Sequence, residues 1–228
     1  MNLFKTINTL LFPPLCLACT YPLTSNEVLV CTQCRHQLPL THIHTDDADT
    51  VAKVFYGRVK IAKATALFWF EKQSIVQHLI HQLKYKGHQE IGTLLGNWLG
   101  AELCKTAHYS TVDVVIPVPL HPRKQRQRGY NQVSTFGLAL AAHLNALYLE
   151  DVLIKTQHTK TQTYKTRLLR WNTIKERFAI RHRDAIANRH ILLVDDVITT
   201  GATLEACAHT LLCVENVKIS IAAMAIVA

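Results

Sequence analysis

The sequence predicts an α/β fold, in which helices cover both faces of a parallel β-sheet, with a small cysteine-rich module in front of it. Continuous apolar runs alternate with segments of helical periodicity over residues 51–228, and unbroken apolar strands are typical of a parallel sheet buried on both faces. Two CxxC pairs lie within residues 1–45, and the polar, acidic segment His44–Thr50 follows them. We therefore expect two units, a metal-binding module at 1–45 and a main domain at 51–228.

The elements of the main domain follow from its apolar runs and from helix start and stop signals. The expected strands, in chain order, are Ala62–Phe70, Val112–Pro119, Ile191–Val194 and Val217–Val227. Ser74 is a possible N-cap for a first helix that Gly87 would end. The later helices are expected at Ile91–Ala107, Asn131–Leu147 and Thr203–Val214.

Charge and hydropathy narrow the class of protein. The 228-residue chain has a formal net charge of +9, and residues 117–190 hold fourteen Lys/Arg against four Asp/Glu, so this zone carries the whole excess. This basic zone favours an anionic partner, either a phosphorylated small molecule or nucleic acid. The simpler alternative is a solvated basic surface without a partner. No apolar run approaches the ~18 residues of a membrane span, and the opening segment lacks the clean apolar run of a signal peptide. We expect a cytoplasmic protein without a membrane span.

The two CxxC pairs, Cys16 with Cys19 and Cys31 with Cys34, have the spacing of a metal site. Each CxxC turn directs two sulfurs to one point, and two turns complete a tetrahedral cage with no open position, which predicts a structural zinc ion. In so short a segment, zinc would contribute on the order of 10 kcal/mol to folding. Redox-active dithiols and an iron–sulfur cluster are the alternatives.

The stretch VDDVITTGAT, residues 194–203, places two carboxylates, Asp195 and Asp196, directly before a turn suited to an anion. A helix that starts near Ala202 offers unpaired backbone N–H groups and the positive end of its dipole to a phosphate, and Gly201 lets the backbone approach it. The hydroxyl donors of the turn are Thr199, Thr200 and Thr203. A sugar phosphate satisfies both halves, because its hydroxyls donate to carboxylates while its phosphate reaches the turn. The alternative is an ordinary strand-to-helix turn without a ligand. A P-loop NTPase is excluded, because the sequence has no GxxxxGK[ST] motif.

VDDVITTGAT also resembles the phosphoribosyl-pyrophosphate (PRPP) signature of type I phosphoribosyltransferases. Three further stretches, LKYKG (83–87), IPVPLHPRKQRQRGYNQ (116–132) and the basic stretch 162–172, resemble the ComF family of competence-related proteins, as does the four-cysteine module. The resemblance covers essentially the whole chain, and the motifs agree in order. It implies a type I phosphoribosyltransferase-like sheet and a PRPP or ribose 5-phosphate ligand.

The same resemblance implies roles for individual residues. Asp195 and Asp196 would contact the ribose hydroxyls, and residues 199–203 would hold the 5-phosphate. Val118 and Pro119, in VIPVPLHP, align with the segment that holds pyrophosphate in related transferases. Residues 161–172 resemble a mobile hood, whose cations would close over the leaving group: Lys165, Arg167 and Arg170. The family also implies a Mg²⁺ ion that bridges PRPP oxygens.

Two functions of different class stay open. The first is a PRPP-dependent phosphoribosyltransferase with an unidentified acceptor, and its candidate catalytic residues are Asp195, Asp196 and Arg167. The second is a non-catalytic module in DNA uptake and natural transformation, which handles single-stranded DNA or docks on helicase-type or recombination proteins. The candidate nucleic-acid contacts are Arg123, Lys124, Arg126 and Arg128, with Tyr130, Tyr164 and Trp171 as candidates for base stacking.

Overall fold

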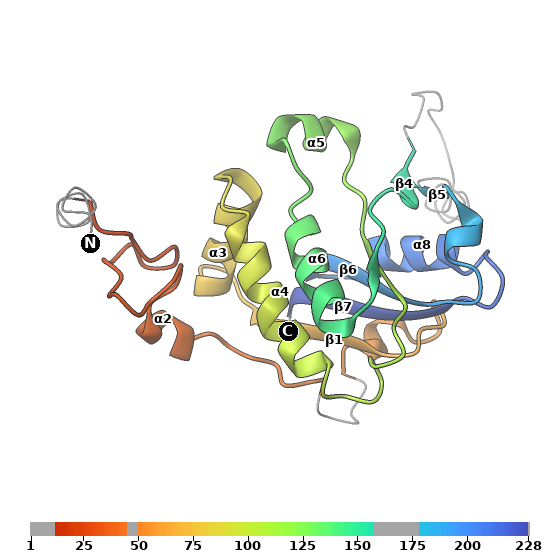
Figure 1. The fold of residues 1–228 in the computed structure, drawn as a ribbon, viewed down its shortest axis with the longest axis horizontal. Helices are drawn as coiled ribbons and strands as arrows, with labels where there is room; N and C mark the ends of the chain where they lie inside the picture. The colour runs from red at the N-terminus through yellow and green to blue at the C-terminus, as the bar shows by residue number, and fades with distance from the viewer. Residues whose placement is uncertain (1–11, 45–49, 157–177, 228) are drawn as a thin grey trace.

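The computed structural model describes residues 12–44, 50–156 and 178–227 (Figure 1). At its centre lies a five-stranded sheet in the order β1-β7-β6-β2-β3, with every neighbouring pair parallel. Its strands are β1 (Ala64–Phe70), β2 (Val114–Pro117), β3 (Leu147–Tyr148), β6 (His190–Ile198) and β7 (Lys218–Val227). A separate antiparallel pair consists of β4 (Leu153–Lys155) and β5 (Phe178–Ile180). The expected α/β class with a parallel sheet is confirmed.

Helices cover both faces of the sheet. One face is covered by α3 (Ile75–Tyr85), α4 (Glu90–Leu103) and α6 (Ser134–Leu144), and the other by α8 (Ala202–Leu211) and the 3₁₀-helix η1 (Ala52–Phe55). Successive side chains of a strand alternate between faces. Leu192 therefore packs with the first group of helices, while Leu193 packs with the second.

Local sequence signals set the bounds of α3 as expected. The Ser74 hydroxyl accepts a hydrogen bond from the Gln77 N–H at 3.2 Å, which satisfies one unpaired donor of the first turn. Gly87, with a φ of +82°, lies just beyond the helix end, where an L side chain would be strained. The α3 helix therefore ends directly after Leu83, Lys84 and Tyr85.

Two of the differences from the prediction lie near the acidic pair. The β6 strand does not end at Val194 but continues to Ile198, so that Asp195 and Asp196 lie within the strand. Residues between β2 and α6 also form a helix, α5 (Pro122–Arg128), where only a basic segment was expected. The His121 ring caps α5 by accepting from the Arg123 N–H at 3.2 Å, which makes it a positioning residue for this helix.

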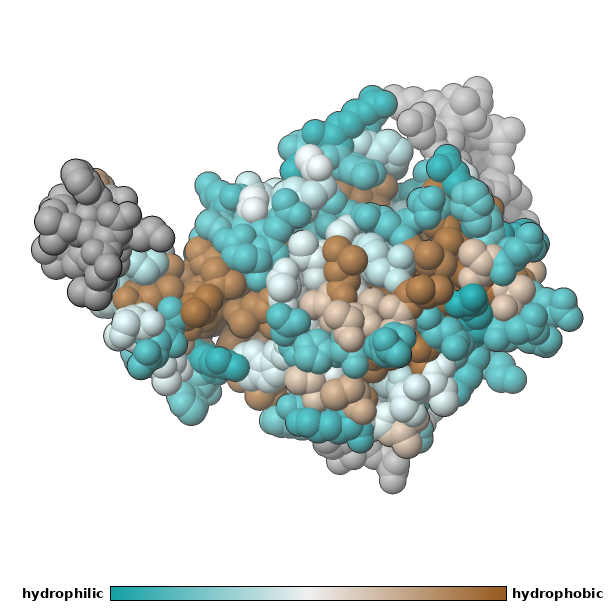
Figure 2. Space-filling model, in the orientation of Figure 1, coloured by the Kyte–Doolittle hydropathy of each residue, from teal (hydrophilic) through white to brown (hydrophobic). Residues whose placement is uncertain are grey.

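The cysteine-containing segment packs on the α3 and α4 side of the main body (Figure 1). It contains the short helix α2 (Thr32–His36) and continues along the edge strand β1, where the Thr41 N–H donates to the Leu67 carbonyl at 3.0 Å. Figure 2 shows apolar surface gathered where this segment meets the main body. Among the described residues, no helix has both the length and the apolarity needed to cross a membrane.

Candidate functional site

The two acids of the sequence motif lie near the carboxyl end of β6 and face different surroundings. Asp195 lines a pocket together with the turn that follows the strand. Asp196 is 8% exposed and makes its side-chain contacts with residues of α3 and of the segment before α6. Consecutive strand residues point to opposite faces of a sheet, which explains the separation.

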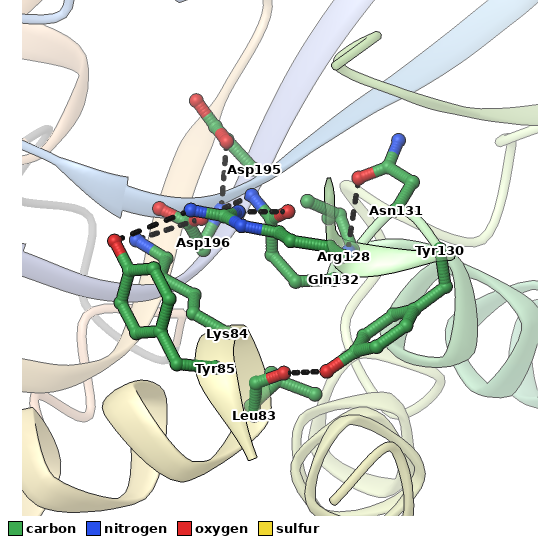
Figure 3. A network of polar contacts seen from close by, with 10 residues as sticks. Leu83, Lys84, Tyr85, Arg128, Tyr130, Asn131, Gln132, Asp195 and Asp196 are labelled. Atoms are coloured by element: carbon green, nitrogen blue, oxygen red, sulfur yellow. Dashed lines mark hydrogen bonds and ion pairs between the residues drawn. The ribbon is translucent and has the colours of Figure 1, made fainter. Parts of the chain in front are cut away.

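Asp196 is held by a cation and an amide (Figure 3). The Lys84 ammonium lies 2.9 Å from its Oδ2 atom, and the Gln132 amide donates to the same oxygen at 2.6 Å. Lys84 comes from the last turn of α3, and Gln132 precedes α6. A buried carboxylate needs such compensation, because burial without a partner costs several kcal/mol.

A second layer of contacts extends this network and joins the two quoted motifs LKYKG and RGYNQ. Arg128 donates to the Gln132 amide oxygen at 2.7 Å, and its guanidinium lies 4.9 Å from the centre of the Tyr85 ring. The Tyr130 hydroxyl donates to the carbonyl of Leu83, the residue before Lys84 (Figure 3). The end of α3, the segment before α6 and β6 are thus fixed to one another by polar contacts.

The electrostatics of Asp195 differ from those of an exposed acid. Desolvation and the charge of Asp196 raise the pKa of Asp195 to about 8, although Lys84 and Lys155 act in the opposite direction. The Asp196 N–H donates to Asp195 Oδ1 at 2.8 Å, which also favours the charged form. At neutral pH, Asp195 is therefore mainly protonated and can donate a hydrogen bond, and above about pH 8 it is mainly a charged acceptor.

The turn between β6 and α8 forms the rest of this pocket, which is lined by residues 195 and 197–204. Gly201 precedes α8 with a φ of +70°, and Phe55 and Val54 of η1 lie directly behind it. A Cβ atom at position 201 would come within 2.9 Å of both, so the turn packs tightly on η1. In the described part of the chain, the Gly201 and Thr203 N–H groups have no hydrogen-bond acceptor. The pocket therefore offers donors from the turn and a carboxyl group from β6.

A larger pocket of about 800 Å³ lies near the carboxyl end of β2. Pro119, the α5 residues Pro122 and Gln125, and the charged side chains of Lys155 and Arg181 are among its lining residues. Val118 adjoins β6 through a hydrogen bond from its N–H to the Val194 carbonyl at 2.9 Å. The segment predicted to hold pyrophosphate thus lies beside β6, but Pro119 faces a different pocket from Asp195.

The sulfur atoms of Cys16, Cys19, Cys31 and Cys34 all lie within 4.8 Å of one another, so this cluster can hold a metal ion. Backbone N–H groups donate to the sulfurs: those of Cys31 and Ala18 point to Cys16 Sγ at 3.3 and 3.4 Å. Such donors stabilise negative sulfur, the form that ligates metals.

The Glu27 side chain accepts two backbone hydrogen bonds within the same cysteine-containing segment. Its carboxylate accepts from the Thr24 N–H at 2.9 Å and from the Thr32 N–H at 2.6 Å. These two bonds, that from Thr24 first, lower the pKa of Glu27 to about 2. The carboxylate therefore stays charged over the physiological pH range and connects Thr24, in the loop between the two CxxC pairs, to Thr32 of the second pair.

Comparison with known proteins shows several relatives over most of the chain. No family model matches the chain. It is 29% identical to the DNA utilization protein YhgH of Shigella flexneri, over 88% of this chain and 91% of that protein. Competence protein F of Haemophilus influenzae is 29% identical, over 66% and 71% of the two chains. Competence protein ComFC of Streptococcus pneumoniae is 30% identical, over 59% and 56%. These similarities, at 28–30% identity, support the resemblance to the ComF family.

Solved structures similar to this chain include phosphoribosyltransferases. The glutamine PRPP amidotransferase from B. subtilis is 18% identical, with a TM-score of 0.42 over 62% of this chain and 30% of that chain. A hypoxanthine phosphoribosyltransferase from Staphylococcus aureus is 19% identical, with a TM-score of 0.36 over 59% and 62%.

The structure brings some of the sequence-predicted site residues together and separates others. Asp195 and the residues of the turn, Thr199, Thr200, Gly201, Ala202 and Thr203, line one pocket. Arg123, Lys124 and Arg126 are exposed on α5, whereas Arg128 is directed into the Asp196 network. The hood candidates Lys165, Arg167 and Arg170 lie outside the described residues, as do Tyr164 and Trp171.

Sequence reasoning missed four side chains of this site. Lys84 and Gln132 lie in motifs that carried the family resemblance, but a contact between residues so far apart in sequence leaves no local signal. Arg58 and Glu205, which contact each other behind the turn between β6 and α8, belong to none of the motifs found in the sequence. Only the position of Glu205, an acid in the first turn of a helix, marks it as a residue that affects the helix N-terminus.

Proposed function

We propose that this chain binds a phosphoribosyl compound, ribose 5-phosphate or PRPP, at the carboxyl end of β6. The observation that carries the proposal is the shared pocket of Asp195 and residues 199–203. The Asp195 carboxylate accepts from ribose hydroxyls, and the N–H and hydroxyl donors of the turn bind the phosphate. Asp196 acts from behind, by fixing Lys84 and Gln132 beside the same strand end.

We further propose that the chain is a phosphoribosyltransferase and that its substrate is Mg²⁺-PRPP. Departure of pyrophosphate builds negative charge, which positioned cations stabilise. Lys84 and Lys155 are described cations whose charges act on Asp195, so they lie near the strand end. Arg167, Lys165 and Arg170 are the further candidates from sequence. Mg²⁺ suits the oxygen-rich pyrophosphate and would enter with the ligand.

Isothermal titration with ribose 5-phosphate, and with PRPP in the presence and absence of Mg²⁺, tests the binding proposal. Near pH 9, above the raised pKa of Asp195, Asp195→Asn is expected to weaken ribose 5-phosphate binding by about tenfold, because an amide replaces a charged acceptor. Asp184→Asn, which removes an exposed acid of the 3₁₀-helix η2 (Arg183–Ala185), is the matched control. Equal affinity in wild type and Asp195→Asn would refute the site. Pyrophosphate release over a panel of nucleophilic acceptors then decides whether the chain is an enzyme.

A second candidate function is handling of single-stranded DNA during DNA uptake. Two observations favour it: similar proteins are named for DNA utilization and competence, and α5 is a short helix whose cations Arg123, Lys124 and Arg126 are all exposed. Tyr85 is 59% exposed beside Arg128 and offers a ring for base stacking. Helicase-type and recombination proteins are the candidate protein partners of such a role.

Fluorescence anisotropy with a labelled oligonucleotide at several salt concentrations tests this second function. Replacing Arg123, Lys124 and Arg126 by Gln is expected to weaken binding and to reduce the slope of log K against log salt by about two to three. Tyr85→Ala is expected to weaken binding without changing that slope, since stacking releases no counterions. A wild-type affinity that does not change with salt would argue against α5 as a phosphate-binding surface.

We infer that the metal of the four-cysteine cluster is zinc and that its role is structural. Four thiolates close a tetrahedral site and leave no position for substrate. Elemental analysis of the purified protein is expected to give one zinc per chain, and a Cys31→Ser variant to give much less. An iron signal with visible absorbance would favour a cluster instead.

A further inference from the structure

The Arg58 side chain contacts the turn between β6 and α8, residues 199–201, although Arg58 lies far away in the sequence. It follows η1, and one of its guanidinium nitrogens, Nη1, donates both to the Val54 carbonyl at 3.0 Å and to the Thr200 carbonyl at 2.7 Å. The other, Nη2, forms an ion pair with Glu205. A single side chain thus connects η1, the turn and the first turn of α8.

The bond to Thr200 sets the direction of a donor. In a planar trans peptide, the carbonyl and the N–H of the next residue point in opposite directions, and the described residues contain no cis peptide. Because the Thr200 carbonyl is turned toward Arg58, the Gly201 N–H is turned away from it. Arg58 is not among the residues that line the pocket, so this N–H points from the side of η1 toward the pocket side of the turn.

The Arg58–Glu205 ion pair compensates a negative charge that would otherwise repel a phosphate in the pocket. Glu205 is 9% exposed and lies in the first turn of α8, close to the N–H groups that would bind an anion. Its uncompensated charge would oppose both its own burial and the approach of a phosphate. Arg58 compensates this charge, and His209 lies farther away, with its Nε2 atom 4.0 Å from Glu205 Oε1.

We propose that Arg58 is a positioning residue for phosphate binding, which aims the Gly201 N–H into the pocket and neutralises Glu205 behind it. This inference rests on the proposed phosphoribosyl site and names a residue that acts on it without touching the ligand. It predicts that Arg58 affects the phosphate-dependent part of ligand affinity and not the part that depends on the sugar.

Titrations of four variants with ribose 5-phosphate and with inorganic phosphate test the inference. Arg58→Gln is expected to weaken both ligands by about tenfold or more. Glu205→Gln alone is expected to change the affinity by less than about threefold. The double variant is expected to recover part of the loss, because the buried charge is gone while the bond to Thr200 is still missing. Lys53→Gln, which removes an exposed cation from η1, is the control.

A merely structural role would give a different pattern. Urea unfolding of each variant shows whether it is folded under the titration conditions, and Arg58→Lys supplies a second test that keeps the charge but serves fewer acceptors. Wild-type binding together with unchanged phosphate affinity in folded Arg58→Gln and Arg58→Lys would overturn the role of Arg58 and leave the site standing. Failure of the wild type to bind either ligand would refute the proposed function itself, and the inference with it.

Discussion

Asp195 and Asp196 are consecutive residues with opposite electrostatic environments. Asp196 has an ammonium group and an amide at hydrogen-bonding distance, so its charge is compensated inside the protein. Asp195 accepts a hydrogen bond from the Asp196 N–H, and the negative charge of the Asp196 side chain raises its pKa. Asp196 therefore fixes the strand to its neighbours, whereas Asp195 is a titratable group that lines a pocket.

The raised pKa of Asp195 predicts a specific dependence of stability on pH. The folded state keeps the Asp195 proton up to about pH 8, whereas the unfolded chain loses it near the ordinary value of 3.8. Between these values the folded state binds more protons, so this group lowers stability as the pH rises. Asp195→Asn is expected to match wild type near pH 4 and to be more stable near pH 8, as measured by urea unfolding. A constant difference across this range would contradict the raised pKa.

The Lys84–Asp196 pair predicts a stability effect in a double-mutant cycle. Lys84→Met is expected to destabilise the fold by about 2 kcal/mol, because it leaves the buried Asp196 charge without its cation. Adding Asp196→Asn is expected to recover most of this loss. Lys86→Met, two residues away and exposed, is the control and should have little effect. Additive effects of the two substitutions in urea unfolding would show that the pair does not interact.

At the scale of single elements, the sequence predicted those parts whose signals are local. Ser74 and Gly87 marked both ends of α3, since capping depends on residues within one turn. The α5 helix was missed because none of its residues is buried and it therefore has no apolar periodicity. The continuation of β6 through Asp195 and Asp196 was missed because charges normally end an apolar strand. Here Lys84 and Gln132, which lie far away in the sequence, make the burial of Asp196 possible.

The contact between α4 and α6 predicts where a single methyl group disrupts the fold. A Cβ atom at Gly96 would lie 2.6 Å from the Phe136 carbonyl oxygen and 2.7 Å from the Ala139 Cβ atom, so α4 and α6 would have to separate. Gly96→Ala is therefore expected to destabilise by about 2 kcal/mol despite the better helix propensity of alanine. Thr93→Ala, exposed on the same helix, is the control. A gain in stability of Gly96→Ala in urea unfolding would contradict this packing.

At the scale of the whole molecule, the cysteine module and the acidic site share one helix. Cys16 and Cys34 belong to the same buried cluster as Leu79 of α3 and Leu95 of α4. The last turn of α3 carries Lys84, which holds Asp196. The boundary at residues 45–51 stays a prediction, but the shared apolar cluster means that loss of the module would expose one side of α3.

Metal removal tests whether the module and the main body unfold together. Chelation is expected to lower the midpoint of thermal unfolding by at least about 5 °C, because the four thiols lose the ion that holds them and α3 loses its cover. Trp98 reports on this contact, since the Arg35 guanidinium lies 4.8 Å from its ring. In a variant that keeps Trp98 alone, with Trp69→Phe and Trp171→Phe, its fluorescence and the far-ultraviolet circular dichroism are expected to change in one transition. Cys104→Ser, at an exposed cysteine outside the cluster, should leave the midpoint unchanged. Two separate transitions, with the second at the midpoint of the metal-loaded protein, would show that the module stabilises only itself.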